Sequence, residues 1–192
     1  MLKSTLSLIL PLIIAVTASA GSRPETTLDS NVAFFEGEDL NYVIFPPEDF
    51  RMVIDSATDD GYSFAFLPTD EPYYRSDLVI GVNFYKIMGM DFATALKNDT
   101  LNVRQHYGEA IDILPVDSVF CGSGEIIPTF FLNDKTGFIP NVMLSYFDGG
   151  SEMIIFELVV TDQYPRFLAE ELFMQCLWRF KAMPIGDLGY GD

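Results

Sequence analysis

The amino-acid sequence predicts an α+β fold: an antiparallel β-sheet meander with helices packed on its faces. Two observations lead to this prediction. Several runs alternate side chains at the period of two that strands require, and short Asn-, Asp- and Gly-rich turns separate the later runs. Two other stretches repeat apolar side chains at the helical period. Consecutive strands joined by tight turns must be antiparallel, which favours α+β over α/β.

The first clear strand signals precede the first helix. Residues 62–67 alternate around Phe64 and Phe66, directly after an Asp60-Gly61 pair that is typical of a turn. Residues 77–86 also alternate, with these apolar side chains on one face: Leu78, Ile80, Val82 and Phe84. Both patterns predict half-buried strands.

The first predicted helix begins after Asp91, a residue type that caps helix N-termini. It runs to Tyr107, before Gly108, which suits the backbone beyond a helix end.

Three consecutive strands are predicted next, over residues 126–132, 140–147 and 152–161. Residues 133–137 and 148–150 separate them with turn-forming Asn, Asp and Gly. The last of the three is largely apolar on both faces, so we expect it to be central and covered on both sides.

A closing helix is predicted over residues 165–180. Its apolar stripe has helical spacing and consists of Ala169, Leu172, Phe173, Cys176, Leu177 and Phe180. We expect this stripe to dock on the sheet.

The N-terminus has the order of a secretory signal peptide over residues 1–20: a basic Lys3, an apolar run and then Ala18-Ser19-Ala20. The alternative, an uncleaved anchor, would need a longer apolar run of roughly 20 residues. We therefore expect an exported protein, periplasmic or secreted, without stable membrane insertion after cleavage. Residues 21–33 are expected to be a flexible leader, 34–183 a single domain and 184–192 a flexible tail.

The charge of the chain is strongly acidic, with 28 acids against 11 bases and a net charge of −17. Such a surface repels phosphate backbones, which excludes a nucleic-acid partner. The acidity itself is typical of solubility, with a cation or a basic partner as the alternative.

Two cysteines, Cys121 and Cys176, remain in a chain predicted to be exported, where oxidation is permitted. They could form a disulfide, or they could be two buried thiols that pack as small apolar groups. The sequence leaves both alternatives open.

A family resemblance enters at residues 61–68, Gly-Tyr-Ser-Phe-Ala-Phe-Leu-Pro. Together with the late meander and the helix from Phe167 to Phe180, this segment resembles the PsbP-like α/β sandwich. That family includes a photosystem II extrinsic protein, a Ran-binding import factor and bacterial periplasmic proteins of unassigned role. The resemblance implies a non-catalytic accessory or binding protein, and it assigns no functional residue.

Catalytic, metal and cofactor sites are not expected. His106 is the only histidine, and with two distant cysteines it falls short of a nucleophile or zinc set. Four pairs of neighbouring acids lie in predicted turns or on a solvent face, where charge is ordinarily solvated: Glu48-Asp49, Asp59-Asp60, Asp70-Glu71 and Glu170-Glu171. A carboxylate-dependent hydrolase is kept only as the alternative function.

The candidate partner-binding loop holds Tyr73, Tyr74 and Arg75, residue types that are enriched at binding hot spots. The alternative is that the tyrosines fold back over the sheet edge. We expect a binding or accessory module for an unidentified protein or small ligand.

If the signal peptide is cleaved as predicted, the mature chain begins at Gly21. N-terminal sequencing of exported protein measures this directly. A chain that still begins at Met1 and sediments with membranes would contradict both the cleavage and the soluble state.

Overall fold

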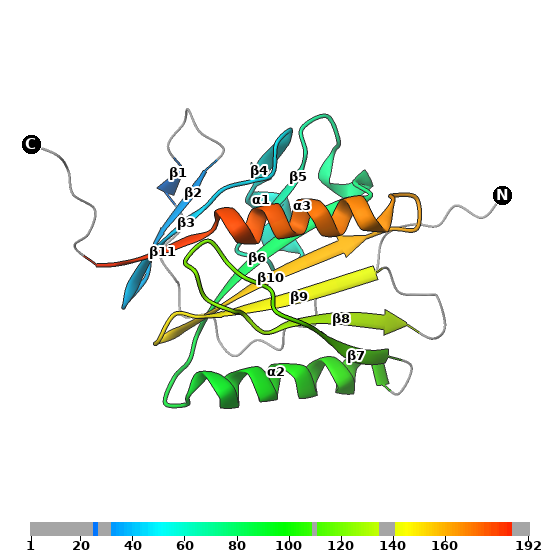
Figure 1. The fold of residues 1–192 in the computed structure, drawn as a ribbon. Helices are drawn as coiled ribbons and strands as arrows, with labels where there is room; N and C mark the ends of the chain where they lie inside the picture. The colour runs from blue at the N-terminus through cyan, green and yellow to red at the C-terminus, as the bar shows by residue number, and fades with distance from the viewer. Residues whose placement is uncertain (1–24, 27–31, 109–110, 135–140, 186–192) are drawn as a thin grey trace, which may run out of the picture.

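The computed structural model describes residues 25–26, 32–108, 111–134 and 141–185, so the predicted signal peptide lies outside the described residues. Figure 1 shows the arrangement of its elements. The strands are β1 (Glu25–Thr26), β2 (Ala33–Glu36), β3 (Leu40–Ile44), β4 (Phe50–Val53), β5 (Phe64–Pro68), β6 (Leu78–Lys86), β7 (Ile111–Val116), β8 (Thr129–Asp134), β9 (Asn141–Asp148), β10 (Glu152–Val160) and β11 (Lys181–Pro184). The helices are α1 (Asp55–Asp59), α2 (Phe92–Tyr107) and α3 (Arg166–Arg179), with a 3₁₀ turn, η1 (Tyr73–Arg75).

The large sheet has seven described strands in the order β4-β5-β6-β10-β9-β8-β7, and every neighbouring pair is antiparallel. Strands β8, β9 and β10 form the predicted meander. Strand β10 occupies the centre, as its two apolar faces predicted. The α+β class is therefore confirmed.

A second, small sheet has the order β1-β2-β3-β11 and brings residues before the large sheet beside the end of the chain. The sequence pattern did not predict this sheet, nor did it predict β4, β7 and α1. These elements span two to six residues each, too short for a periodic pattern to stand out.

The large sheet is covered on both faces (Figure 1). On one face, α3 and the small sheet pack on the α3-side core, whose large members include Tyr42, Phe64, Phe66, Phe156, Phe173 and Phe180. On the other face, α2 packs on the α2-side core, formed by Ile87, Ala95, Ile111, Leu132, Val142, Leu144, Tyr146, Met153 and Ile155. A third group, the α1-side cluster of Ala57, Tyr62 and Ala65, lies beside it.

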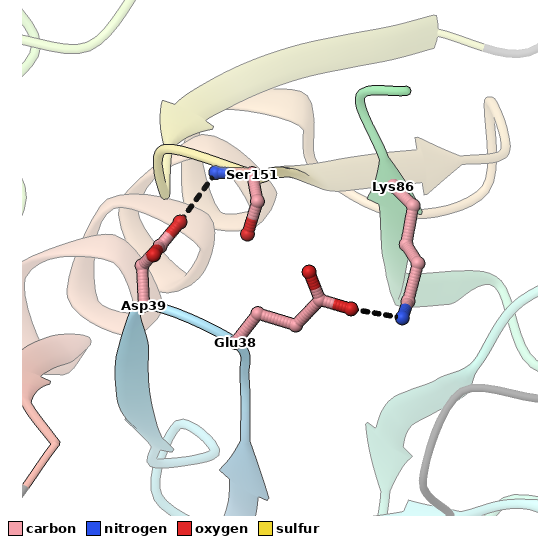
Figure 2. Close-up of polar contacts among 4 residues, drawn as sticks. All are labelled: Glu38, Asp39, Lys86 and Ser151. Carbon is pink, nitrogen blue, oxygen red and sulfur yellow. Dashed lines mark hydrogen bonds and ion pairs between the residues drawn. The ribbon is translucent and has the colours of Figure 1, made fainter. Parts of the chain in front are cut away.

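Polar contacts between turns fasten the small sheet to the large one (Figure 2). The backbone N–H of Ser151, in the β9–β10 turn, donates to Oδ2 of Asp39 over 2.8 Å. The Glu38 carboxylate forms an ion pair with the Lys86 ammonium at the end of β6. These contacts have a structural role, since they join two turns of the fold.

Both predicted helices are confirmed. Asp91 caps α2, because its Oδ1 accepts a hydrogen bond of 2.7 Å from the Thr94 N–H. Gly108 follows α2 with a φ of 67°, a conformation that glycine adopts at low cost. In α3 the buried residues are Ala169, Phe173, Cys176 and Leu177, all from the predicted stripe.

The two cysteines are buried and not joined. Cys176 packs from α3 into the α3-side core, and Cys121 reaches the same core from a turn closed by its own N–H and the Glu125 carbonyl over 2.9 Å. Of the two alternatives that the sequence left open, the disulfide is wrong. The cysteines are two thiols that pack as small apolar groups.

Both thiols of the native protein should resist alkylation. Burial raises the pKa of the Cys176 thiol to about 12, and the thiolate is the reactive species. Alkylation followed by mass measurement should give an unlabelled native chain and a doubly labelled chain after non-reducing denaturation. A denatured chain that labels only after reduction would show that the cysteines are bonded.

Candidate functional site

The predicted partner loop divides into an inward and an outward part. Tyr73 is half-buried and packs against the α1-side cluster. Tyr74 is 71% exposed, and the Arg75 guanidinium lies 5.5 Å from the centre of its ring. Tyr73 therefore folds back onto the protein, as the alternative interpretation of this loop expected. Tyr74 and Arg75 stay available for contact.

Two of the sequence-adjacent acids have local structural contacts. Glu71, from one of these pairs, holds its own loop: its Oε2 accepts from the Ser76 hydroxyl over 2.7 Å and from the Asp77 N–H over 3.3 Å. Glu170 pairs with Arg166 one helical turn away. The His106 side chain lies outside the described residues.

An exposed aromatic groove lies between α3 and the segment after β7. It has a volume of about 480 Å³ and is lined by Val116, Asp117, Ser118, Val119, Phe120, Glu171, Met174, Gln175 and Trp178. Trp178 is 74% exposed and Phe120 is 53% exposed. Fully burying side chains of this size stabilises a complex, so two exposed aromatics beside one groove make it a candidate contact surface.

A stripe of side chains that includes part of the groove lining runs along α3. Phe167, Glu171, Met174 and Trp178 follow one another at helical spacing, and Phe167 is 69% exposed. At about 1.5 Å per residue the stripe is about 16 Å long. The sequence carried a signal for it, because Phe167 and Trp178 are apolar residues that fall off the buried stripe.

A second constellation, the tyrosine–carboxylate cluster, lies on the α2 face of the large sheet. It consists of Glu157, Asp99, Tyr62, Tyr73, Tyr85 and Tyr146, which influence one another electrostatically. Glu157 comes from the central strand β10 and Asp99 from α2, 58 positions earlier in the chain. Sequence reasoning missed this pair, because no local spacing connects its members.

Burial dominates the electrostatics of the cluster. It raises the pKa of Glu157 to about 7; the negative charge of Asp99 adds to the rise, and the Tyr62 hydrogen bond opposes it. Burial also raises the pKa of Asp99, against the hydrogen bond of 2.7 Å that the Tyr146 hydroxyl donates to its Oδ2. Both carboxyls of the cluster therefore have pKa values raised above the ordinary ones.

The position of Tyr62 depends on Gly81. Glu157 pairs with Gly81 on β6, and Gly81 pairs with Ala65 on β5, so two small residues leave a hollow beside the carboxyl. The Tyr62 ring fills it: a Cβ at position 81 would overlap this ring. Gly81 is thus the residue that lets Tyr62 reach Glu157.

Across residues 25–26, 32–108, 111–134 and 141–185, no three His, Cys, Asp or Glu side chains are grouped so that they could hold a metal ion. No helix within these ranges is long and apolar enough to cross a membrane.

Comparison with known proteins adds a likeness in fold. The structure is similar to the solution structure of cyanobacterial PsbP (CyanoP) from Synechocystis sp. PCC 6803, with a TM-score of 0.48 and 13% sequence identity. The match covers 73% of this chain and 85% of that chain. The sequence pattern resembles the same PsbP-like fold. The structural match concerns the fold alone. No family model and no curated protein matches the chain.

Replacing Gly81 with Ala should destabilise the protein by about 1–3 kcal/mol, because the added methyl group displaces the Tyr62 ring from a packed position. Chemical denaturation measures the loss. The matched control is the same substitution in a Tyr62→Ala background, where the overlap no longer exists and the cost should shrink. An equal cost in both backgrounds would contradict the packing of Tyr62 on Gly81.

Proposed function

We propose that this protein is an exported, soluble and non-catalytic binding module whose partner surface is the aromatic groove of Phe120, Met174 and Trp178. The observation that carries the proposal is the exposure of Trp178 and Phe120 on two elements that border one groove. Tryptophan is among the residue types most enriched at the hot spots of protein interfaces.

The chemistry of the partner follows from the charges around the groove. Asp117 and Glu171 line it, and the whole chain has a net charge of −17. A segment with an apolar anchor and flanking Lys or Arg would bury the aromatics and complement these acids. The same charge disfavours a second copy of this chain as the partner.

The carboxylate-dependent hydrolase is the weaker alternative. Asp99 and Glu157 are the converging acids that it would require; both are half-buried, and they lie against the buried side chains of Tyr146, whose hydroxyl donates to Asp99, and Tyr62. The groove, in contrast, is open to a partner as it stands.

Trp178 is the only tryptophan in the chain, so its fluorescence reports directly on occupation of the groove. We expect a synthetic peptide with a Leu or Phe anchor flanked by lysines to shift the Trp178 emission to shorter wavelength, with an affinity that falls as salt rises. Phe120→Ala should weaken binding by about 2 kcal/mol, the scale of a hot-spot residue, without lowering the melting temperature.

Two controls separate the alternatives. The same peptide with glutamates in place of the lysines should not bind. Tyr74→Ala should leave binding unchanged, whereas a loss in this variant would move the partner surface to the Tyr73-Tyr74-Arg75 loop. An emission spectrum that no basic peptide alters would contradict the groove as a site for such partners.

A further inference from the structure

The outward stripe of α3 has the spacing of a helix-packing surface. Its members follow one another at intervals of four, three and four positions: Phe167, Glu171, Met174 and Trp178. Three of them are exposed and Met174 is half-buried. At 3.6 residues per turn these side chains fall within roughly 60° of one another, on the side of the helix opposite its buried stripe. Such a repeat is the pattern by which two helices pack along each other at a small crossing angle.

The opposite wall of the groove also presents exposed apolar side chains. Phe120 lines it and forms a β-bridge with Ile126, which is 62% exposed. On the edge strand β7, Leu114 is directly opposite Phe131 of the α3-side core, so Leu114 is on the same face of the sheet, and it is 45% exposed. Apolar contact surface is therefore present on both sides of the groove.

Strand β7 disfavours the other common way of binding a segment, which is the addition of a strand to a sheet edge. It is the last strand of the large sheet within the described residues, and its end borders the groove. Pro115 has no backbone N–H to donate, and beyond Val116 the chain turns through Ser118, whose φ is 54°. The edge beside the groove therefore offers no continuous run of backbone donors, and side chains have to provide the recognition.

The charges at the groove define the polar side of its occupant. Asp117 and Glu171 come from its two walls, and none of the described lining residues is a base. The arginines of α3 are engaged elsewhere, since Arg166 pairs within the helix and Arg179 donates to the Pro46 carbonyl over 3.0 Å. Acids on both walls complement a helix that carries Lys or Arg on each flank of its apolar stripe.

We infer that the groove binds an amphipathic α-helix of a partner protein, about three turns long, whose apolar stripe packs along α3 between flanking lysines or arginines. The inference rests on the proposed function and specifies the conformation of the partner segment. A helix of this length covers Phe120 and Trp178 at one end and reaches Phe167, about 16 Å along α3, at the other. An extended segment anchored by Phe120 and Trp178 does not need Phe167. Dependence on Phe167 therefore separates the two kinds of occupant.

The test uses the full chain and two amidated synthetic peptides of about 14 residues each. One has leucines at the four-three-four spacing, lysines on both flanks and alanines on its outward face. The other has a proline in place of one central outward alanine, which breaks the helix and keeps every leucine and lysine. Titrations followed by Trp178 emission should give the first peptide a dissociation constant at least about ten times lower. Its circular dichroism should gain helical signal on binding.

Phe167→Ala should weaken binding of the helical peptide about tenfold, the scale of a hot-spot residue. Tyr74→Ala is the matched control, because it removes an exposed aromatic side chain from η1, and it should bind as the wild type does.

Three results would overturn the inference. Equal affinities for the two peptides, or an unchanged affinity in Phe167→Ala, would show that the occupant is an extended basic segment, and the proposed function would stand. Binding of neither peptide would contradict the proposed function as well. A shift of the Trp178 emission by neutral phosphatidylcholine vesicles, without binding of either peptide, would assign the groove to a lipid surface.

Discussion

The fold depends on one strand, β10, that is buried on both faces. It pairs with β6 along its whole length and with β9 along nearly all of it. Alternate side chains of β10 enter the α3-side core and the α2-side core, represented by Phe156 and Ile155. Each face must then be covered, since an apolar sheet face left in water would cost roughly 25 cal/mol for each Å² exposed. The positions of α2, α3 and the small sheet follow from this requirement.

The two surfaces of interest arise from that arrangement in opposite ways. On the α3 side, the buried stripe of the helix covers the apolar face of the sheet. Trp178 and Phe167 lie off that stripe and are exposed. On the α2 side, α2 covers one part of the sheet and α1 another, and Glu157 of β10 lies in register between Leu144 of β9 and Gly81 of β6.

The long regular elements could be predicted from the sequence because their signals are local. The alternation in β6, the two apolar faces of β10 and the stripe of α3 each extend over nine or more residues. The small sheet could not be predicted, since β3 pairs with β11 across more than 130 positions of the chain. The candidate loop was found by residue type, but only packing showed that Tyr73 turns inward.

The sequence by itself determined the α+β class, the antiparallel meander, the central place of β10 and the buried position of Cys176. Each is a consequence of periodicity or of turn chemistry within one segment. The tertiary structure alone decided that the cysteines stay apart, that Phe120 and Trp178 share a groove, and that Asp99 meets Glu157. Such encounters depend on which strands become neighbours, and strand order is set by the packing of the whole chain rather than by any local pattern.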